Sequence, residues 1–215
     1  DSMIAQGVVD ALDAACDKKL NVLPVQRLGC SEHNMSLDGT LTLPHEVFEQ
    51  VAMQLIDAMF RHGFRRFLIL NAHGGNRAVG GVIAEKASSR WTDAEVIFAT
   101  WFQLAAERIR PLVEGEFPSV GHACEFETSV MLLLHPDLVD MSKAEDDGLP
   151  PPQKQLQNDL LTGGAAAKAI PFNVMTRKGA FGRPTLASKE KGRRVLDETV
   201  AALKQLIEDV WPGSV

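Results

Sequence analysis

Two short apolar runs near the middle of the chain, residues 67–70 and 95–100, are separated by a helix-length segment at 77–90. Each run is short, apolar and bounded by polar residues, which is typical of a strand buried on both faces. A strand, a helix and a second strand in this order predict parallel strands joined by a crossover helix. We therefore expect an α/β fold in which helices cover both faces of a mostly parallel sheet.

Other segments fit the same architecture. Apolar residues recur at helical spacing in residues 3–16, 44–62 and 187–210, and a further helix is expected at 126–136. Residues 21–25 are expected to form another strand, which a polar loop follows. These elements extend the strand and helix alternation along most of the chain.

One stretch breaks the pattern. Residues 143–185 contain three consecutive prolines at 150–152 and a glycine and alanine run at 163–167, and they show no clear period. Long irregular stretches in compact domains usually have a function, so we expect this excursion to act as a lid or as a subunit contact. A length of 215 residues suits one domain, which we expect to span residues 1–215.

Charge and composition exclude several classes of function. The chain has 22 Lys and Arg against 28 Asp and Glu, so no basic excess favours nucleic-acid binding. No apolar run reaches the ~18 residues that a membrane span needs. Cys16, Cys30 and Cys124 share no CxxC spacing, so neither a disulfide framework nor a zinc knuckle is expected. This cysteine usage favours a reducing cytoplasm.

Three polar clusters follow predicted strands or open a predicted helix: residues 31–40, 71–76 and 121–129. In a parallel α/β sheet, ligands bind at the carboxyl ends of the strands. His73 in the second cluster lies between a strand and two glycines, which leave an imidazole accessible. That position suits a metal ligand or a catalytic base, and the alternative is a turn with a capping histidine.

The third cluster places His122 close to Glu125 and Glu127. A histidine beside carboxylates suits a zinc or manganese site, or an acid–base relay. Acidic residues with Thr128 also favour a helix N-terminus, so simple capping stays open as an alternative. Trp101, at the end of the 95–100 strand, is expected either to form a pocket wall or to pack in the core.

The segments 71–76 (NAHGGN) and 122–129 (HACEFETS) together resemble the creatininase, or creatinine amidohydrolase, family. Further matches lie at 1–5, 38–43 and 182–192, so the resemblance covers almost the whole chain in the right order. It implies a three-layer α/β/α hydrolase with a two-metal centre that opens amide bonds, which are often cyclic.

The resemblance also implies roles for single residues. Asp1 falls at the aspartate that bridges two divalent metals, typically zinc with manganese or iron, and His73 matches a metal-binding histidine. His122 matches a histidine of proton transfer, and Trp101 matches an aromatic residue near the substrate.

We assign the remaining polar residues around these positions. Glu127 is expected to be a metal ligand and Glu125 to act with His122 in catalysis, although the two carboxylates are interchangeable at this point. Glu32 and His33 are expected to shape the substrate pocket.

Two departures from the family pattern matter. The Glu-x-His segment that precedes the bridging aspartate in the family is absent, so we expect further residues upstream of Asp1. Gly75 stands where creatininase has a glutamate ligand, and Glu125 or Glu127 would have to replace it.

The function expected from these residues is hydrolysis of a small amide, creatinine-like or formamide-like, by metal-activated water. The alternative is a non-catalytic structural or assembly member of the family with an incomplete metal site. The expected partners are a small-molecule amide substrate and further copies of the chain, in a hexamer by family resemblance.

Overall fold

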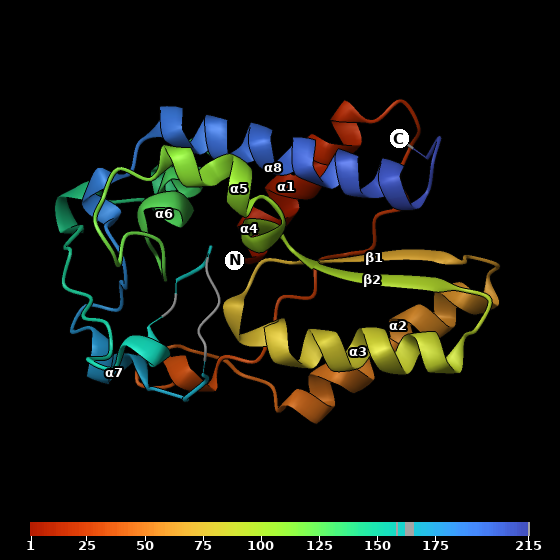
Figure 1. The fold of residues 1–215 in the computed structure, drawn as a ribbon, viewed down its shortest axis with the longest axis horizontal. Helices are drawn as coiled ribbons and strands as arrows, with labels where there is room; N and C mark the ends of the chain where they lie inside the picture. Colours follow the sequence, from red (N-terminus) through yellow and green to blue (C-terminus); the bar gives the residue numbers. More distant parts are fainter. Residues whose placement is uncertain (158, 162–165, 215) are drawn as a thin grey trace.

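The computed structural model describes residues 1–157, 159–161 and 166–214 (Figure 1). The two strands are β1 (Arg66–Asn71) and β2 (Glu95–Thr100). The longer helices are α1 (Ser2–Ala15), α2 (His45–Arg61), α3 (Arg77–Arg90), α6 (Glu125–Leu134) and α8 (Lys189–Val210). Short helices are α4 (Trp101–Leu104), α5 (Ala106–Ile109) and α7 (Phe172–Met175), and the short 3-10 turns include η1 (Glu32–Asn34), η2 (Gly74–Asn76) and η7 (Pro184–Leu186).

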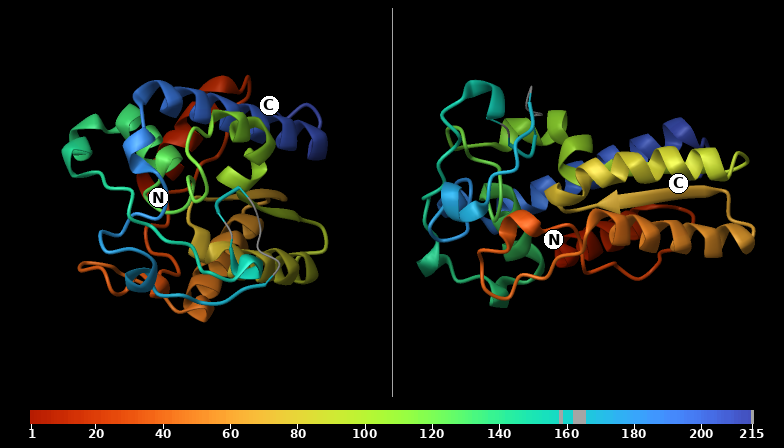
Figure 2. Two further views of the ribbon diagram at one scale, coloured as in Figure 1. Left: turned by 60° about the vertical axis from the view of Figure 1, so that its left-hand side comes forward. Right: turned by 90° about the horizontal axis from the view of Figure 1, so that it is seen from below.

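The sheet separates two helical layers. Strands β1 and β2 pair in parallel, from Arg66 opposite Glu95 to Asn71 opposite Thr100, and α3 is part of the connection between them. Helices α2 and α3 lie on one side of the strands, whereas α1 and α8 lie on the other (Figure 1), and Figure 2 shows the same layers from two further directions. The predicted three-layer α/β/α fold is confirmed, with two strands in the described part of the chain.

Successive side chains of β1 enter different cores. Phe67 and Ile69 pack against the core formed with α2 and α3, whereas Leu68 and Leu70 pack against the core formed with α1, α6 and α8. Successive strand residues point to opposite faces of a sheet, so an uninterrupted apolar run is required when both faces are covered. The run at 67–70 therefore predicted the two-sided burial correctly.

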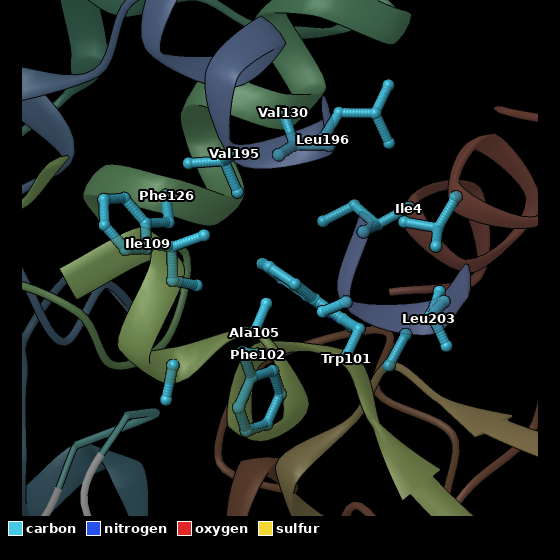
Figure 3. Packing of buried hydrophobic residues seen from close by; sticks show 14 of the residues in the cluster. Ile4, Trp101, Phe102, Ala105, Ile109, Phe126, Val130, Val195, Leu196 and Leu203 are labelled. Carbon is cyan, nitrogen blue, oxygen red and sulfur yellow. The ribbon is translucent and has the colours of Figure 1, made fainter. Parts of the chain in front are cut away.

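Trp101 lies in the core and not in a pocket wall. Its side chain is 1% exposed and meets Phe102 edge to face, with 5.4 Å between ring centroids. Figure 3 shows the Trp101 ring among Ile4, Ala105 and Leu203. The predicted substrate-binding role of Trp101 stays a prediction, and the buried indole Nε1 has no hydrogen-bond partner among the described residues.

The strand expected at 21–25 is absent. These described residues form no ladder with β1 or β2, and Val22 and Leu23 are 46% and 42% exposed. The prediction was wrong because an apolar run forms a strand only where another strand can pair with it. Pro24 also has no N–H to donate to a ladder.

The described part of residues 143–185 contains short helical turns and the four-residue helix α7. Asp147 fastens α7 to this segment, since its carboxylate accepts hydrogen bonds from Thr176 Oγ1 at 2.8 Å and from the Arg177 amide at 2.8 Å. Most of the predicted glycine and alanine run lies outside the described residues.

In the part of the chain that the structure describes, no helix is long and apolar enough to cross a membrane. Cys16, Cys30 and Cys124 are free thiols.

Candidate active site

His73 follows β1 and is fixed by the two asparagines of the 71–76 segment. The Asn71 side chain accepts a hydrogen bond from the His73 amide at 3.1 Å and donates to the His73 carbonyl at 2.9 Å. Asn76 donates to Asn71 Oδ1 at 3.2 Å and accepts from the Cys30 amide at 2.9 Å. The asparagines therefore hold His73 and the segment around Cys30 in one rigid unit at the carboxyl end of β1.

Gly75 is required by close packing in this unit. A Cβ atom at position 75 would lie 2.0 Å from the Cys30 carbonyl oxygen and 2.6 Å from His73 Nε2. Such contacts are far inside van der Waals distance, so no side chain fits there without moving the backbone. A glutamate at this position is therefore incompatible with the present packing.

The imidazole of His73 links Cys30 to Asp1. Its Nε2 atom lies 3.1 Å from the Cys30 carbonyl oxygen and 3.2 Å from Ser31 Oγ. Its Nδ1 atom lies 2.9 Å from Asp1 Oδ2. A ring proton on Nδ1 donates to this carboxylate, whereas a ring proton on Nε2 donates to the Cys30 carbonyl and leaves the Nδ1 lone pair able to bind a metal ion.

The Nδ1 atom can therefore hold either a proton or a metal ion. Burial lowers the pKa of His73 below its ordinary value of 6.5, although the hydrogen bond to the Cys30 carbonyl opposes this shift. Burial thus favours the neutral imidazole, in which one nitrogen carries no proton. A nitrogen and a carboxylate oxygen facing each other are ligands that zinc and manganese accept. The Asp1 and His73 pair therefore fits part of a metal centre.

The pair is not a whole metal centre. Within residues 1–157, 159–161 and 166–214, no group of three or more His, Cys, Asp or Glu side chains is arranged to hold a metal ion. Protein zinc sites normally have three or four protein ligands. The described residues therefore supply two candidate ligands, Asp1 and His73, and further ligands would have to come from side-chain movement, water, substrate or other chain segments.

A row of aromatic rings extends from His73 to His122. His33 in η1 stacks on His73, with centroids 5.5 Å apart and an interplanar angle of 8°. Phe172 in α7 lies 5.4 Å from His33 and 4.6 Å from His122. We call His33, His73, His122, Phe172 and Asp1 the histidine cluster. It brings four predicted site residues together, and Phe172 joins them from the irregular 143–185 excursion.

His122 lies in a loop that precedes α6. Its amide donates to the Phe181 carbonyl at 2.6 Å, and the Phe181 amide donates to the His122 carbonyl at 2.7 Å. Burial, and the charges of His73 and His33, lower the pKa of His122 from 6.5 to about 4. The His122 imidazole is therefore neutral at pH 7, a state in which one ring nitrogen accepts a proton and the other donates one.

Glu127 supports the backbone of this loop. Its Oε2 atom accepts a hydrogen bond from the Ala123 amide at 2.7 Å, next to His122, and Ala123 adopts a left-handed conformation with φ of 46°. Burial raises the pKa of Glu127 to about 7, and hydrogen bonds from the Ala123 and Cys124 amides oppose the rise. The metal-ligand role predicted for Glu127 stays a prediction, because its carboxylate is bound to the loop backbone.

The other predicted site residues lie elsewhere. Glu125 is fully buried and bonds to Lys191, Ser119 and the backbone of Glu114. The prediction that Glu125 is catalytic is therefore corrected, since an enclosed carboxylate cannot reach a substrate. Glu32 has an exposed side chain at the start of η1, beside His33.

Sequence reasoning missed Phe172. The chain has ten phenylalanines, and no local pattern distinguishes this one from those in the core. A weak signal was available, because Phe172 stands in an irregular, polar and proline-rich stretch where a buried aromatic ring is unusual.

Comparison with known proteins gives one family and several relatives. The family profile described as creatinine amidohydrolase matches residues 1–207. A 3-dehydro-scyllo-inosose hydrolase of Thermotoga maritima is 26% identical over 194 residues, which are 83% of this chain and 61% of that protein. The creatinine amidohydrolase of Pseudomonas putida is 25% identical over 87% of this chain and 70% of its own length. A mycofactocin precursor peptide peptidase of Mycobacterium ulcerans is 26% identical over 92% and 70%.

Solved structures share the fold. A crystal structure of a creatininase has a TM-score of 0.74 at 23% identity, and the match covers 98% of this chain and 81% of the other. A manganese form of creatininase has a TM-score of 0.73 at 22% identity, covering 97% and 80%. A Zn–Zn form of a creatininase variant has a TM-score of 0.64 at 24% identity, covering 81% and 67%. At these identities the likeness establishes the architecture.

Proposed function

The chain belongs to the creatininase family, and from this premise we propose that it is a metal-dependent hydrolase that opens an amide bond of a small molecule. The observation that carries the proposal is the contact of 2.9 Å between His73 Nδ1 and Asp1 Oδ2, in one cluster with a neutral His122. A pair of candidate ligands beside a proton-transfer group is the part of a metal-assisted hydrolase site that the described residues supply.

The proposed metal is a divalent ion held by His73 and Asp1. Creatininase structures with manganese and with zinc support these two metals. A bound divalent ion polarises a carbonyl group and lowers the pKa of bound water towards ~7. Asn71 keeps His73 in place through two hydrogen bonds to its backbone, and with Nδ1 bound to the metal a ring proton on Nε2 would donate to the Cys30 carbonyl.

The proposed role of His122 is proton transfer to the leaving nitrogen. Its neutral ring can accept a proton at one nitrogen and release it to the departing amine. Phe172 and the paired backbone at Phe181 restrict the orientation of the ring. His33 and Phe172 would exclude water from the space beside His122, because both rings lie in the same row.

The substrate class is proposed from the relatives together with the cluster. The three named relatives act on an inosose, on creatinine and on a precursor peptide, so hydrolysis is common to their names and the bond is not. We propose a small carboxamide, either cyclic as in creatinine or open-chain, because an aromatic row of neutral rings suits a planar, uncharged group better than a charged one.

The test is hydrolysis by the purified protein loaded separately with Zn²⁺ and Mn²⁺. Creatinine, small cyclic amides and N-formyl amines form the substrate panel, and release of amine or ring opening is the readout. We expect turnover that chelation abolishes and that metal restores. A protein that binds metal tightly and opens no amide in the panel would contradict the proposed reaction.

One observation favours a second candidate, a non-catalytic family member. The described residues contain no set of three metal-binding side chains, which is the state expected of a subunit that kept the fold and lost the site. Metal analysis of the intact natural protein separates the two. Fewer than about one tightly bound divalent ion per chain would favour the non-catalytic candidate.

A further inference from the structure

A buried ion pair joins α6 to α8, beneath the loop that carries His122. Glu125 of α6 is fully buried, and its Oε1 atom contacts Nζ of Lys191, whose side chain is 5% exposed. The same Lys191 nitrogen lies 3.0 Å from Glu114 Oε1 and donates to the Leu186 carbonyl at 2.8 Å. Lys191 thus reaches three chain segments from one position.

The carboxylate of Glu125 also binds the loop at residues 114–119. It accepts hydrogen bonds from the Glu114 amide at 2.9 Å, from the Gly115 amide at 3.4 Å and from the Ser119 hydroxyl. Each oxygen of Glu125 therefore has partners, and none is left for a substrate. Ser119 is 2% exposed and marks the start of the loop that leads to His122.

Two routes of contact connect this pair to His122. In the first, Ser119 bonds to Glu125 by its hydroxyl and accepts from the Arg183 amide at 3.0 Å by its carbonyl. In the second, Lys191 holds Leu186, whose amide donates to the Arg183 carbonyl at 3.1 Å. The segment that contains Arg183 also contains Phe181, which pairs with His122 through two backbone hydrogen bonds.

We propose that the Glu125–Lys191 ion pair positions the His122 loop, so that both residues are positioning residues of the site. The pair closes a ring of contacts through Ser119, Arg183 and Leu186, and this ring joins the two segments that pair at His122 and Phe181. The effect on turnover rests on the proposed function, whereas the effect on His122 geometry does not.

A purely structural role makes a different prediction. Replacing both partners of a buried ion pair by neutral side chains of similar shape often leaves stability unchanged, whereas removing one partner leaves a buried charge unpaired. The double variant Glu125→Gln with Lys191→Met therefore tests the position of the His122 loop separately from the stability of the fold. If the pair only stabilises the fold, a folded double variant will leave the position of the His122 loop unchanged.

The measurement is nuclear magnetic resonance of histidine-labelled full-length protein. We expect the folded double variant to shift or broaden the imidazole signals of His122, and to speed exchange of the His122 amide about tenfold, because a weaker local bridge opens more often. The metal content should stay unchanged. The control is the double variant Lys86→Met with Glu49→Gln, which replaces a surface ion pair 2.6 Å apart between α2 and α3. It should leave the imidazole signals and the amide exchange of His122 unchanged.

Unchanged His122 signals and amide exchange in a folded double variant would overturn the proposal. Where the double variant does not fold, Ser119→Ala decides, since it removes one hydroxyl and leaves the ion pair intact. A shift of the His122 signals then supports the proposal and unaltered signals overturn it. On a substrate that the wild type hydrolyses, the kcat of the folded Glu125→Gln and Lys191→Met double variant should fall by about 10²-fold with little change in KM. Absence of any wild-type turnover would refute the proposed function alone.

Discussion

The Nδ1 atom of His73 lies 2.9 Å from the Oδ2 atom of Asp1, although the two residues are 72 positions apart in the chain. His73 reaches this place from the carboxyl end of β1, and Asp1 from the start of α1. Two elements on different parts of the fold thus bring an imidazole nitrogen and a carboxylate oxygen together, and the opposite ring nitrogen lies 3.1 Å from the Cys30 carbonyl oxygen.

Removal of His73 should remove the metal. We expect His73→Ala to lose bound divalent ion and activity together, because Asp1 alone offers a single carboxylate. Elemental analysis of the purified variant measures the metal per chain. His62→Ala, at the exposed end of α2, is the control and should keep the wild-type content. Retention of the metal by His73→Ala would show that the ligands lie elsewhere.

His122 should be dispensable for metal binding and needed for turnover. We expect His122→Gln to keep its metal and to lower kcat by roughly 10²–10⁴-fold, the usual scale for a general acid or base. Steady-state kinetics and elemental analysis on the same preparation check both parts. Loss of metal in this variant would assign His122 to the metal centre instead.

Two neighbouring glycines should respond differently to the same substitution. A Cβ atom at Gly75 meets the Cys30 carbonyl oxygen at 2.0 Å, whereas at Gly74 it meets nothing within 4 Å. Gly75→Ala should therefore lower the free energy of unfolding by about 1–3 kcal/mol, as overpacking does. Gly74→Ala should change it by less than ~0.5 kcal/mol. Urea unfolding compares the pair, and equal midpoints would contradict the packing at Gly75.

Phe172 should shield the rings of His33 and His122. Its side chain is 7% exposed and lies against both, whereas Val174 in the same helix is 70% exposed. We expect Phe172→Ala to accelerate modification of His122 by diethyl pyrocarbonate, and Val174→Ala to leave the rate unchanged. Peptide mass spectrometry gives the rate for each histidine. A His122 rate unaffected by Phe172→Ala would mean that another group covers the ring.

Asp147 should contribute stability that depends on pH. Burial raises the pKa of Asp147, but hydrogen bonds from Thr176 and from the Arg177 and Lys178 amides outweigh it, so the pKa lies below its ordinary value of 3.8. A carboxyl with a lowered folded-state pKa contributes its stability fully above the unfolded value and loses it as the pH falls through the folded value.

The corresponding variant is Asp147→Asn. At pH 7 we expect it to be less stable than the wild type by about 1.5–3 kcal/mol, the range for hydrogen bonds to a charged group. The difference should shrink as the pH falls from 3.8, the unfolded-state value, through the lower pKa of folded Asp147. Thermal unfolding at a series of pH values measures this. Glu145→Gln, in a half-exposed surface pair with Lys178, should show little effect at any pH.

The sequence by itself determined the layers and most of the elements. Apolar periodicity marked the helices now seen as α1, α2 and α8, and the apolar runs marked β1 and β2. The NAHGGN segment also pointed to His73 at the end of a strand. These features are local, because a strand or helix that must bury one or two faces carries that requirement in its own residues.

The tertiary structure decided which polar groups meet. Glu125 and Glu127 are two positions apart in one helix, so their side chains point in directions roughly 200° apart. Both are buried, and Lys191, 66 positions from Glu125, forms the ion pair with Glu125. Phe172 reaches His122 from a segment without periodicity, and Trp101 is buried in the core that α1, α6 and α8 share. Contacts of this kind depend on how distant surfaces pack, and no local pattern records them.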